Sequence, residues 1–284
     1  MARKLTIDLS TELAEGFAID PFGVPLEVLS QVVIPASGRQ LHPRQLMARA
    51  DDALLPIVSS AYLACGLHSG DPLVIQRLVP ELITNGITIG AHPSYPDLFD
   101  FGQHRVVMTE DELVSVFLYQ LGALQGILRQ FDQKIAYVKC HGALYFDVAE
   151  DTWACDALIC AINIFDPEII IVAPAGTPTM DRLRASGLRI AREGFADRGY
   201  DNTGRILARD HPQALHQNPD EIVAQVLNFV ERGVVEAEDG SVIPLRVDTL
   251  CLHSDTPGAA ETAHAIADAL RKRGIAIAPM TTQL

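Results

Sequence analysis

The chain has 284 residues, of which 48% are hydrophobic and 20% charged, a composition typical of a globular protein long enough to form one large domain. Its formal net charge of −14 argues against nucleic acid or an anionic membrane as the main partner. No apolar run approaches the ~20 residues that span a bilayer, and the first residues contain no signal-peptide core. The five cysteines form no C-x-x-C pair. We therefore expect a cytoplasmic protein with reduced thiols.

Seven short apolar segments with the composition of buried strands are spaced along the chain. Longer stretches with helical periodicity separate them, and this alternation is typical of βα units around a mainly parallel sheet. Because the chain has no Gly-x-Gly-x-x-Gly fingerprint, we favour a closed or nearly closed barrel over a doubly wound open sheet. The predicted strands are 5–10, 59–65, 87–92, 136–141, 168–174, 189–197 and 248–255.

Two of the intervening stretches carry several helix signals at once. Thr109 and Glu112 stand three positions apart, the spacing of a capping box, and an amphipathic stripe of apolar residues follows them. Asn218 is a second predicted cap, with Pro219 at the first helical position and Gly233 after the end of the helix. We therefore expect a helix to begin after each cap.

A proline recurs just after three of the predicted strands. Each time, an Asp or Thr that can cap a helix precedes a proline suited to the first helical position. The sequence thus predicts that a helix begins at the proline of each motif. The motifs are GDP (70–72), GTP (176–178) and DTP (255–257).

Two segments depart from the strand–helix rhythm. Residues 20–56 form a proline-punctuated insertion after the first strand, and residues 233–247 predict a small hairpin around Asp239 and Gly240. No linker rich in Gly and Ser divides the chain. We therefore expect residues 1–284 to form a single domain with an insertion at about 20–56.

Ionisable residues follow six of the seven predicted strands. In a parallel αβ barrel the catalytic groups come from the C-terminal ends of the strands, so these scattered residues would converge on one rim. A single histidine at a strand end is more often structural than catalytic, but a purely structural explanation of all of them requires several coincidences. The candidates are Asp8 with Glu12 and Glu15, His68 with Asp71, His92, Lys139 with His141, Asp197 with Arg198, and His253 with Asp255.

Structural roles stay open for several of these residues. Asp71 is well placed to cap the next helix, Glu12 and Glu15 can be solvated, and Arg198 can pair with Asp197. The residue pattern alone therefore defines a rim but does not assign every member a role.

The chemistry that such a rim supports is restricted. The chain has neither a Gly-x-Ser-x-Gly elbow nor a P-loop. Carboxylates with imidazoles suit general-base activation of water or a divalent metal, with Asp8, His68 and His92 as candidate ligands. Lys139 would stabilise a developing oxyanion or a phosphate. From the residues alone we expect hydrolysis of an amide or a related bond.

Six motifs at these strand ends and on one helix resemble the LamB/YcsF family in the correct order. The resemblance extends from the first strand to the last helix. It implies a distorted seven-stranded (β/α) barrel of the glycoside hydrolase/deacetylase type, related to polysaccharide deacetylases. The motifs are SSAYLACGLHSGDP (59–72), IGAHPSYPD (89–97), YQLGALQ (119–125), VKCHGALY (138–145), FADRGY (195–200) and CLHSDTP (251–257).

The resemblance also implies an activity and partners. It implies the A subunit of an ATP-dependent 5-oxoprolinase, which hydrolyses 5-oxo-L-proline to L-glutamate together with subunits B and C and shares ATP with them. The family's typical positions present here are Asp8, Glu15, His68, Gly70, Asp71, His92, Lys139, His141, Asp197, Arg198, His253 and Asp255.

These positions suggest roles for the reaction. Asp8 or a nearby carboxylate–histidine pair would activate the nucleophile, and Lys139 with Arg198 would offset phosphate or oxyanion charge. The remaining histidines of the rim would shuttle protons or bind a divalent metal. These histidines are His68, His92, His141 and His253.

The first strand end departs from the family pattern. The chain reads DLSTELAEGFA from Asp8, where the family usually reads DLNCDLGESFG, so another lactam or cyclic amide stays open as the substrate. Two alternatives to the family activity also stay open. One is a stand-alone, metal-dependent deacetylase or amidohydrolase, and the other is a non-catalytic subunit of a lactamase complex. Self-association as a homo-oligomer is a further open point.

Overall fold

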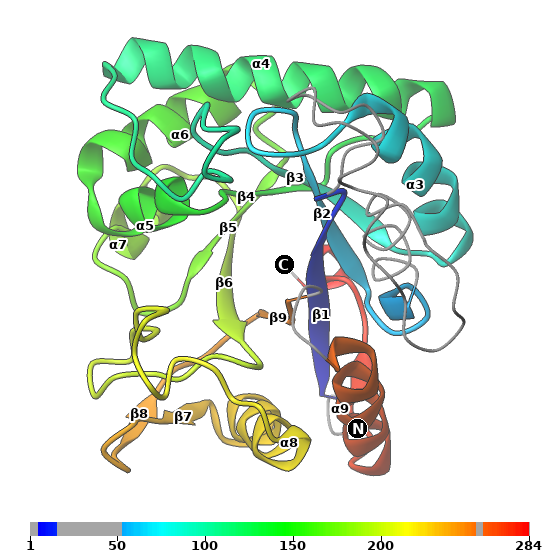
Figure 1. The fold of residues 1–284 in the computed structure, drawn as a ribbon, viewed down its shortest axis with the longest axis vertical. Helices are drawn as coiled ribbons and strands as arrows, with labels where there is room; N and C mark the ends of the chain where they lie inside the picture. The colour runs from blue at the N-terminus through cyan, green and yellow to red at the C-terminus, as the bar shows by residue number, and fades with distance from the viewer. Residues whose placement is uncertain (1–4, 16–52, 254–257, 284) are drawn as a thin grey trace, which may run out of the picture.

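Seven parallel strands close into a ring in the structure, a computed structural model that describes residues 5–15, 53–253 and 258–283 (Figure 1). In order around the ring they are β1 (Thr6–Leu13), β2 (Ser60–Ala64), β3 (Thr88–His92), β4 (Tyr137–Lys139), β5 (Ile170–Pro174), β6 (Ile190–Phe195) and β9 (Thr249–Cys251). Hydrogen bonding of β1 to both β2 and β9 closes the ring. The predicted seven strands and the preference for a closed barrel over an open sheet are confirmed.

Helices cover the outside of the ring (Figure 1). Apolar residues on one face of each strand pack against them, and on β1 these are Ile7, Leu9 and Leu13. Burying each such side chain stabilises the fold by roughly 1.5–3 kcal/mol. The helices are α3 (Pro72–Thr84), α4 (Glu110–Leu128), α5 (Ala143–Glu150), α6 (Thr152–Phe165), α7 (Met180–Ala185), α8 (Pro219–Leu227) and α9 (Ala259–Lys272), with short turns η1 (Arg129–Phe131), η2 (Asn228–Arg232) and η3 (Met280–Thr282).

The predicted caps of two helices are confirmed. Thr109 and Glu112 form the capping box of α4, in which each side chain accepts a hydrogen bond from the backbone N–H of the other. The Asn218 side chain caps α8, which has Pro219 in its first turn. The helix continues into the π turn η2 and ends at Gly233, whose φ of 65° is in the left-handed region that favours glycine.

The proline motifs have mixed outcomes. Asp71 caps α3 as predicted, accepting a hydrogen bond from the backbone N–H of Leu73 at 2.7 Å. The prediction for residues 176–178 is wrong, because the Thr177 hydroxyl donates to the carbonyl of Pro174 and α7 begins only at Met180. The local cap signal is overridden there by the turn that closes β5. Residues 255–257 lie outside the described residues.

A small hairpin and a short final strand complete the fold. The predicted hairpin is confirmed as β7 (Val234–Glu236) paired antiparallel with β8 (Val242–Pro244). Strand β10 (Ala276–Ile277) pairs in parallel with the first residues of β1. Most of the predicted insertion at 20–56 lies outside the described ranges, so the single-domain arrangement stays a prediction.

The interior of the barrel is filled by side chains. Alternate strand residues point to opposite faces, so one set of residues turns inward. The inward residues, which include Tyr62 and Tyr137, form an apolar cluster with Met280 of η3 that is distinct from the cluster beneath the helices. Gly90 on β3 makes room for the two tyrosines, since a Cβ there would lie 2.5 Å from Tyr137 Cδ2 and 2.9 Å from Tyr62 Cδ1. The polar groups described below therefore lie above a packed floor. In the part of the chain described, no helix is long and apolar enough to cross a membrane.

Candidate active site

A buried lysine lies where the strands end. Lys139 is the last residue of β4 and only 1% exposed. Its Nζ is 2.8 Å from Glu12 Oε1, 2.9 Å from Glu193 Oε1 and 3.2 Å from Cys251 Sγ. Burial alone lowers the pKa of a lysine, but the Cys251 sulfur and the two carboxylates outweigh it and raise the pKa of Lys139 well above its usual value. Lys139 is therefore a fixed ammonium ion.

Aromatic rings enclose the remaining sides of this ammonium group. Lys139 Nζ lies 5.2 Å from the ring centroid of Tyr62, 5.6 Å from that of Tyr145 and 5.0 Å from that of Phe195. Cation–π attraction is stronger in a desolvated site. The Tyr145 hydroxyl also donates to Glu193 Oε2 at 2.6 Å, which holds this carboxylate in place.

Three imidazoles lie beside the lysine. His92 Nδ1 is 2.8 Å from the Lys139 carbonyl oxygen, and His141 Nδ1 is 3.0 Å from His92 Nε2. His141 Nε2 is 2.8 Å from the Phe101 carbonyl oxygen. His68 stacks on His141 with ring centroids 3.8 Å apart. Burial, assisted by the neighbouring His92, lowers the pKa of His141 to about 3, so this imidazole is uncharged at neutral pH.

A glycine allows the loop before α4 to reach these imidazoles. Gly142, directly after His141, has a φ of 58°, and a Cβ there would lie 2.2 Å from the Gly102 carbonyl oxygen. Only glycine permits this close approach. The approach brings Phe101 and its carbonyl against the His141 ring.

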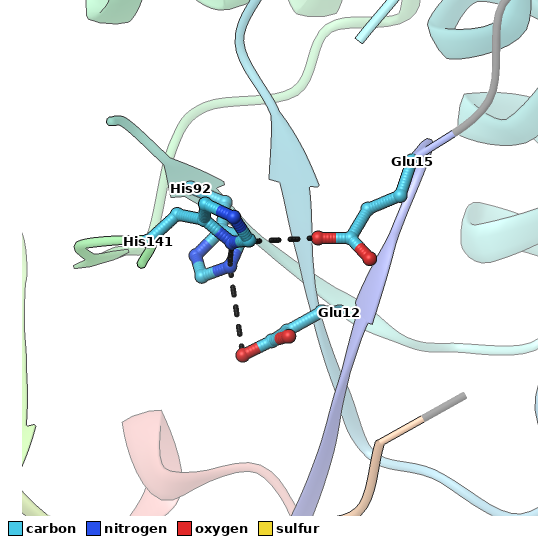
Figure 2. A group of neighbouring side chains, drawn as sticks. All are labelled: Glu12, Glu15, His92 and His141. Carbon is cyan, nitrogen blue, oxygen red and sulfur yellow. Dashed lines mark hydrogen bonds and ion pairs between the residues drawn. The ribbon is translucent and has the colours of Figure 1, made fainter. Parts of the chain in front are cut away.

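Two carboxylates from β1 and the residues after it face the imidazoles (Figure 2). Glu12 Oε1 lies 3.5 Å from His92 Nε2, and Glu15 Oε1 lies 3.5 Å from His141 Nδ1 and 3.7 Å from His68 Nε2. One donor atom from each of Glu12, Glu15, His92 and His141 lies within 4.8 Å of the other three. These donor types and this spacing suit a divalent metal ion.

A cationic side faces this cluster. His253 Nδ1 lies 3.0 Å from Asp197 Oδ2, and although burial opposes the charge, the Asp197 carboxylate produces a net rise in the pKa of His253. The Arg198 guanidinium donates to the carbonyl oxygens of Leu207 and Ala214. Among the described residues no carboxylate lies within ion-pair distance of it. Arg198 therefore fixes the loop after β6 and keeps its charge available.

A hollow lies between the two sides. It contains about 410 Å³ of space between protein atoms, part of it open to solvent, and Glu12, Lys139, His141, Arg198 and Arg209 are among the residues that line it. A larger hollow of about 880 Å³ lies under the loop after β6 and is lined by His216 and three glutamates, but no lysine or arginine is among its described lining residues. We take the smaller hollow as the candidate site because the chemistry converges there.

Most of the predicted rim residues are brought together, but Asp8 and Asp71 are not, and Asp71 caps α3 instead. Asp255 lies outside the described residues. Asp8 lies elsewhere, because β1 continues to Leu13 and Asp8 is therefore mid-strand. The predicted residues around the hollow and its imidazole cluster are Glu12, Glu15, His68, His92, Lys139, His141, Asp197, Arg198 and His253.

The prediction that Asp8 ends the first strand is therefore wrong. Its carboxylate accepts hydrogen bonds from the hydroxyls of Ser59, Ser60 and Thr249 at 2.5–2.7 Å. Burial raises the pKa of Asp8 to about 6, against these hydrogen bonds. At ~3.3 Å per residue, Asp8 lies about 13 Å along the strand from Glu12. The proposed ligand set of Asp8, His68 and His92 is thus not assembled, and Glu12 takes the place expected of Asp8.

Sequence reasoning missed Glu193, Tyr145 and Arg209. Glu193 was recognisable in principle, because it stands four residues before Asp197 in the predicted strand and so shares its face. Tyr145 and Arg209 carried no comparable local signal, since a helix and a loop bring them to the hollow.

Comparisons with known proteins add an independent line of evidence. The model of the LamB/YcsF family matches residues 38–284. A Methylococcus capsulatus protein, named as the A subunit of 5-oxoprolinase, is 46% identical over 230 residues, which are 81% of this chain and 88% of that protein. An Acinetobacter baumannii protein of the same name is 42% identical over 233 residues, covering 82% of this chain and 92% of that protein.

A solved structure is similar over nearly the whole chain. The crystal structure of a lactam utilization protein from Thermus thermophilus superimposes with a TM-score of 0.81 at 32% sequence identity. The match covers 96% of this chain and 99% of that one. Fold and sequence therefore lead to the same group of proteins.

Proposed function

The chain belongs to the LamB/YcsF family, and on that premise we propose that it is the A subunit of an ATP-dependent 5-oxoprolinase. Its substrate would be 5-oxo-L-proline or a closely related lactam, hydrolysed to the open-chain amino acid. The names of two relatives at 42–46% identity support this assignment. The observation that carries it is the hollow at the barrel mouth, with an imidazole–carboxylate cluster on one side and cationic groups on the other.

The cationic side suits an anionic substrate. 5-Oxoproline carries a carboxylate, and a phosphorylated intermediate would carry a phosphate. Guanidinium groups bind either oxyanion through charge-assisted hydrogen bonds. Arg198 and Arg209 both line the hollow, and neither has a carboxylate within ion-pair distance in the described ranges. Arg209 lies on the exposed edge, where it can meet an incoming substrate.

ATP would overcome the stability of the lactam ring. The amine and carboxyl groups released by ring opening stay tethered, and tethered groups reach effective molarities of ~10⁵ M or more. Transfer of the γ-phosphoryl group of ATP to the lactam oxygen would activate the ring carbon. Water would then add to that carbon and the C–N bond would break, with the proton going to the amine. A second water would cleave the resulting acyl phosphate to give glutamate and phosphate.

The residues of this chain would divide that work between the two sides of the hollow. Arg198 and Arg209 would hold the substrate carboxylate or the phosphate, and Lys139 would stabilise the developing oxyanion. The uncharged imidazole of His141, with the carboxylates near it, lies on the side where water would be activated.

The relatives' name also supports a multi-subunit enzyme. We propose that subunits B and C complete the complex and share ATP with this chain. This chain would contribute the barrel site.

A coupled assay tests the proposal. The chain with its partner subunits, 5-oxoproline and ATP should produce glutamate and ADP together, with neither product formed when 5-oxoproline or ATP is left out. Arg209→Ala should raise KM about 10- to 100-fold, the equivalent of one charge-assisted hydrogen bond. The control Arg273→Ala removes an exposed arginine paired with Glu231 and should leave KM unchanged.

The metal-type donor cluster supports a second candidate, a metal-dependent amidohydrolase that acts without ATP. Metal-dependent cleavage of N-acyl substrates by the isolated chain, together with no ATP-coupled glutamate formation in the complex, would favour it over the first.

A further inference from the structure

Backbone carbonyls determine which nitrogens of two histidines carry hydrogen. A carbonyl oxygen can only accept a hydrogen bond, so His92 Nδ1 must donate to Lys139 O and His141 Nε2 must donate to Phe101 O, both at 2.8 Å. The Gln103 amide nitrogen is a more distant neighbour of His141 Nε2, at 3.4 Å. The two remaining ring nitrogens, His92 Nε2 and His141 Nδ1, face each other at 3.0 Å. In neutral imidazoles both of these atoms present lone pairs.

Two facing lone pairs require a positive centre between or beside them. Either a proton is shared by the two rings, or a cation is bound by both nitrogens. The carboxylates distinguish these choices, because Glu12 Oε1 lies 3.5 Å from His92 Nε2 and Glu15 Oε1 lies 3.5 Å from His141 Nδ1. A metal with bonds of ~2.0–2.2 Å separates neighbouring ligand atoms by about 3.0–3.5 Å. The three observed separations of 3.0, 3.5 and 3.5 Å fit that requirement.

A third imidazole gives independent support. His68 is fully buried, and neither of its ring nitrogens has a hydrogen-bond partner among the described residues. Its Nε2 lies 3.7 Å from Glu15 Oε1, and its ring stacks on His141. A buried polar group without a hydrogen bond costs about 1–3 kcal/mol, so such a group calls for an ion or an ordered water nearby. His68 borders the cluster and meets that condition.

We propose that the four residues of Figure 2, Glu12, Glu15, His92 and His141, bind one divalent ion of the first transition row. His68 would lie beside this ion. Two imidazoles and two carboxylates suit Zn²⁺, Mn²⁺, Fe²⁺ or Co²⁺, whereas Mg²⁺ and Ca²⁺ prefer ligand sets made entirely of oxygen. A bound ion would supply Lewis-acid activation of water or of a carbonyl group. The inference adds a cofactor to the site proposed above, but metal binding is measured without substrate, so either proposal can fail alone.

The experiment uses the full-length chain after removal of metal with a chelator. Zn²⁺ is titrated by calorimetry, and bound zinc is counted per chain after gel filtration. We expect one tightly bound ion. His141→Ala should weaken binding more than about 100-fold, above the 10- to 100-fold effects of groups that only support a ligand. Glu15→Gln, which keeps the shape of the side chain, should weaken it at least about tenfold. Equal melting temperatures in chelator will establish that both variants are folded.

Two control variants test for other binding modes. His104→Ala disrupts a second group that could bind a cation, formed by half-buried Asp97 with exposed Asp100 and His104. His264→Ala removes an exposed histidine on α9. Both should keep the tight site. The proposal is overturned if no zinc is retained, or if His104→Ala removes the binding while His141→Ala and Glu15→Gln preserve it. Either result would mean that His92 Nε2 and His141 Nδ1 share a proton and do not bind a metal ion together.

Discussion

Replacing Lys139 with methionine should strongly destabilise the protein at neutral pH. The substitution keeps most of the side-chain volume but removes the ammonium that lies 2.8 Å from Glu12 and 2.9 Å from Glu193. The buried carboxylate of Glu193 and the largely buried carboxylate of Glu12 then lose their shared counter-ion. Removing one partner of a buried ion pair costs about 3–5 kcal/mol, a large share of the 5–15 kcal/mol that a typical domain has in total. We expect the free energy of unfolding to fall by that amount.

The stability lost on Lys139→Met should be greater at neutral pH than at acidic pH. In the native protein burial raises the pKa of Glu12, but Lys139 and then His92 outweigh it and hold that pKa well below its usual value. This contribution to stability is present above the unfolded pKa of ~4.3 and is lost as the pH falls through the folded pKa. In the variant, burial dominates and the folded protein favours a protonated Glu12. The difference in the free energy of unfolding between the native protein and Lys139→Met should therefore be larger near pH 7.5 than at pH 5.

Urea unfolding in the presence of chelator measures both effects. Lys134→Met removes an exposed lysine from the loop before β4 and is the matched control, expected within about 0.5 kcal/mol of the native protein. Adding Glu193→Gln to Lys139→Met removes one uncompensated charge and should recover part of the loss. A Lys139→Met protein within 1 kcal/mol of the native one at pH 7.5 would refute the ion-pair reasoning, since this loss is below the ~3–5 kcal/mol expected.

Three further substitutions test other parts of the structure. Asp197→Asn removes the carboxylate that raises the pKa of His253, so NMR titration of His253 should show a lower pKa in the variant. In the native protein the stability gained from the charged pair is present below pH ~6.5 and is lost as the pH rises through the folded pKa of His253. The stability of the variant should lack this pH dependence. Asp8→Asn should change kcat less than about tenfold, because Asp8 lies below the hollow and its carboxylate is held there by three hydroxyl groups. A loss of kcat as large as that expected for a catalytic group would contradict this placement of Asp8 outside the site. Gly90→Ala should lower the free energy of unfolding by about 1–3 kcal/mol, because its Cβ would overlap Tyr137, and an unchanged urea midpoint would contradict this packing.

The parts of the fold that the sequence predicted are those determined by local interactions. The capping box of Thr109 and Glu112 and the cap at Asn218 involve residues three or fewer positions apart, so their signals are complete within one segment. The error at Asp8 arose because Ser10, Thr11 and Glu12 are three polar residues in succession, which interrupts the alternation of polar and apolar residues while the strand itself continues to Leu13. Only the pairing of residues 10–13 with β2 shows how far the strand extends.

The pairing of Lys139 with Glu193 could not be predicted in the same way. The two residues are on β4 and β6, separated by β5, and their side chains meet only because the sheet curls into a barrel. Periodicity could show that Glu193 shares a strand face with Asp197, but not that this face encloses a lysine. The location of the site was therefore predictable, whereas the charge balance within it was not.

That charge balance changes how Lys139 can act. The ammonium group lies within ion-pair distance of the carboxylates of Glu12 and Glu193, at 2.8 and 2.9 Å. One of its three N–H groups donates to the Cys251 sulfur at 3.2 Å, a weak acceptor whose thiol is kept protonated because burial raises its pKa. An oxyanion entering the hollow is a far better acceptor than a thiol, so it would take this hydrogen while both ion pairs stay intact. Lys139 would then stabilise negative charge with one donor already oriented and without leaving either carboxylate unpaired.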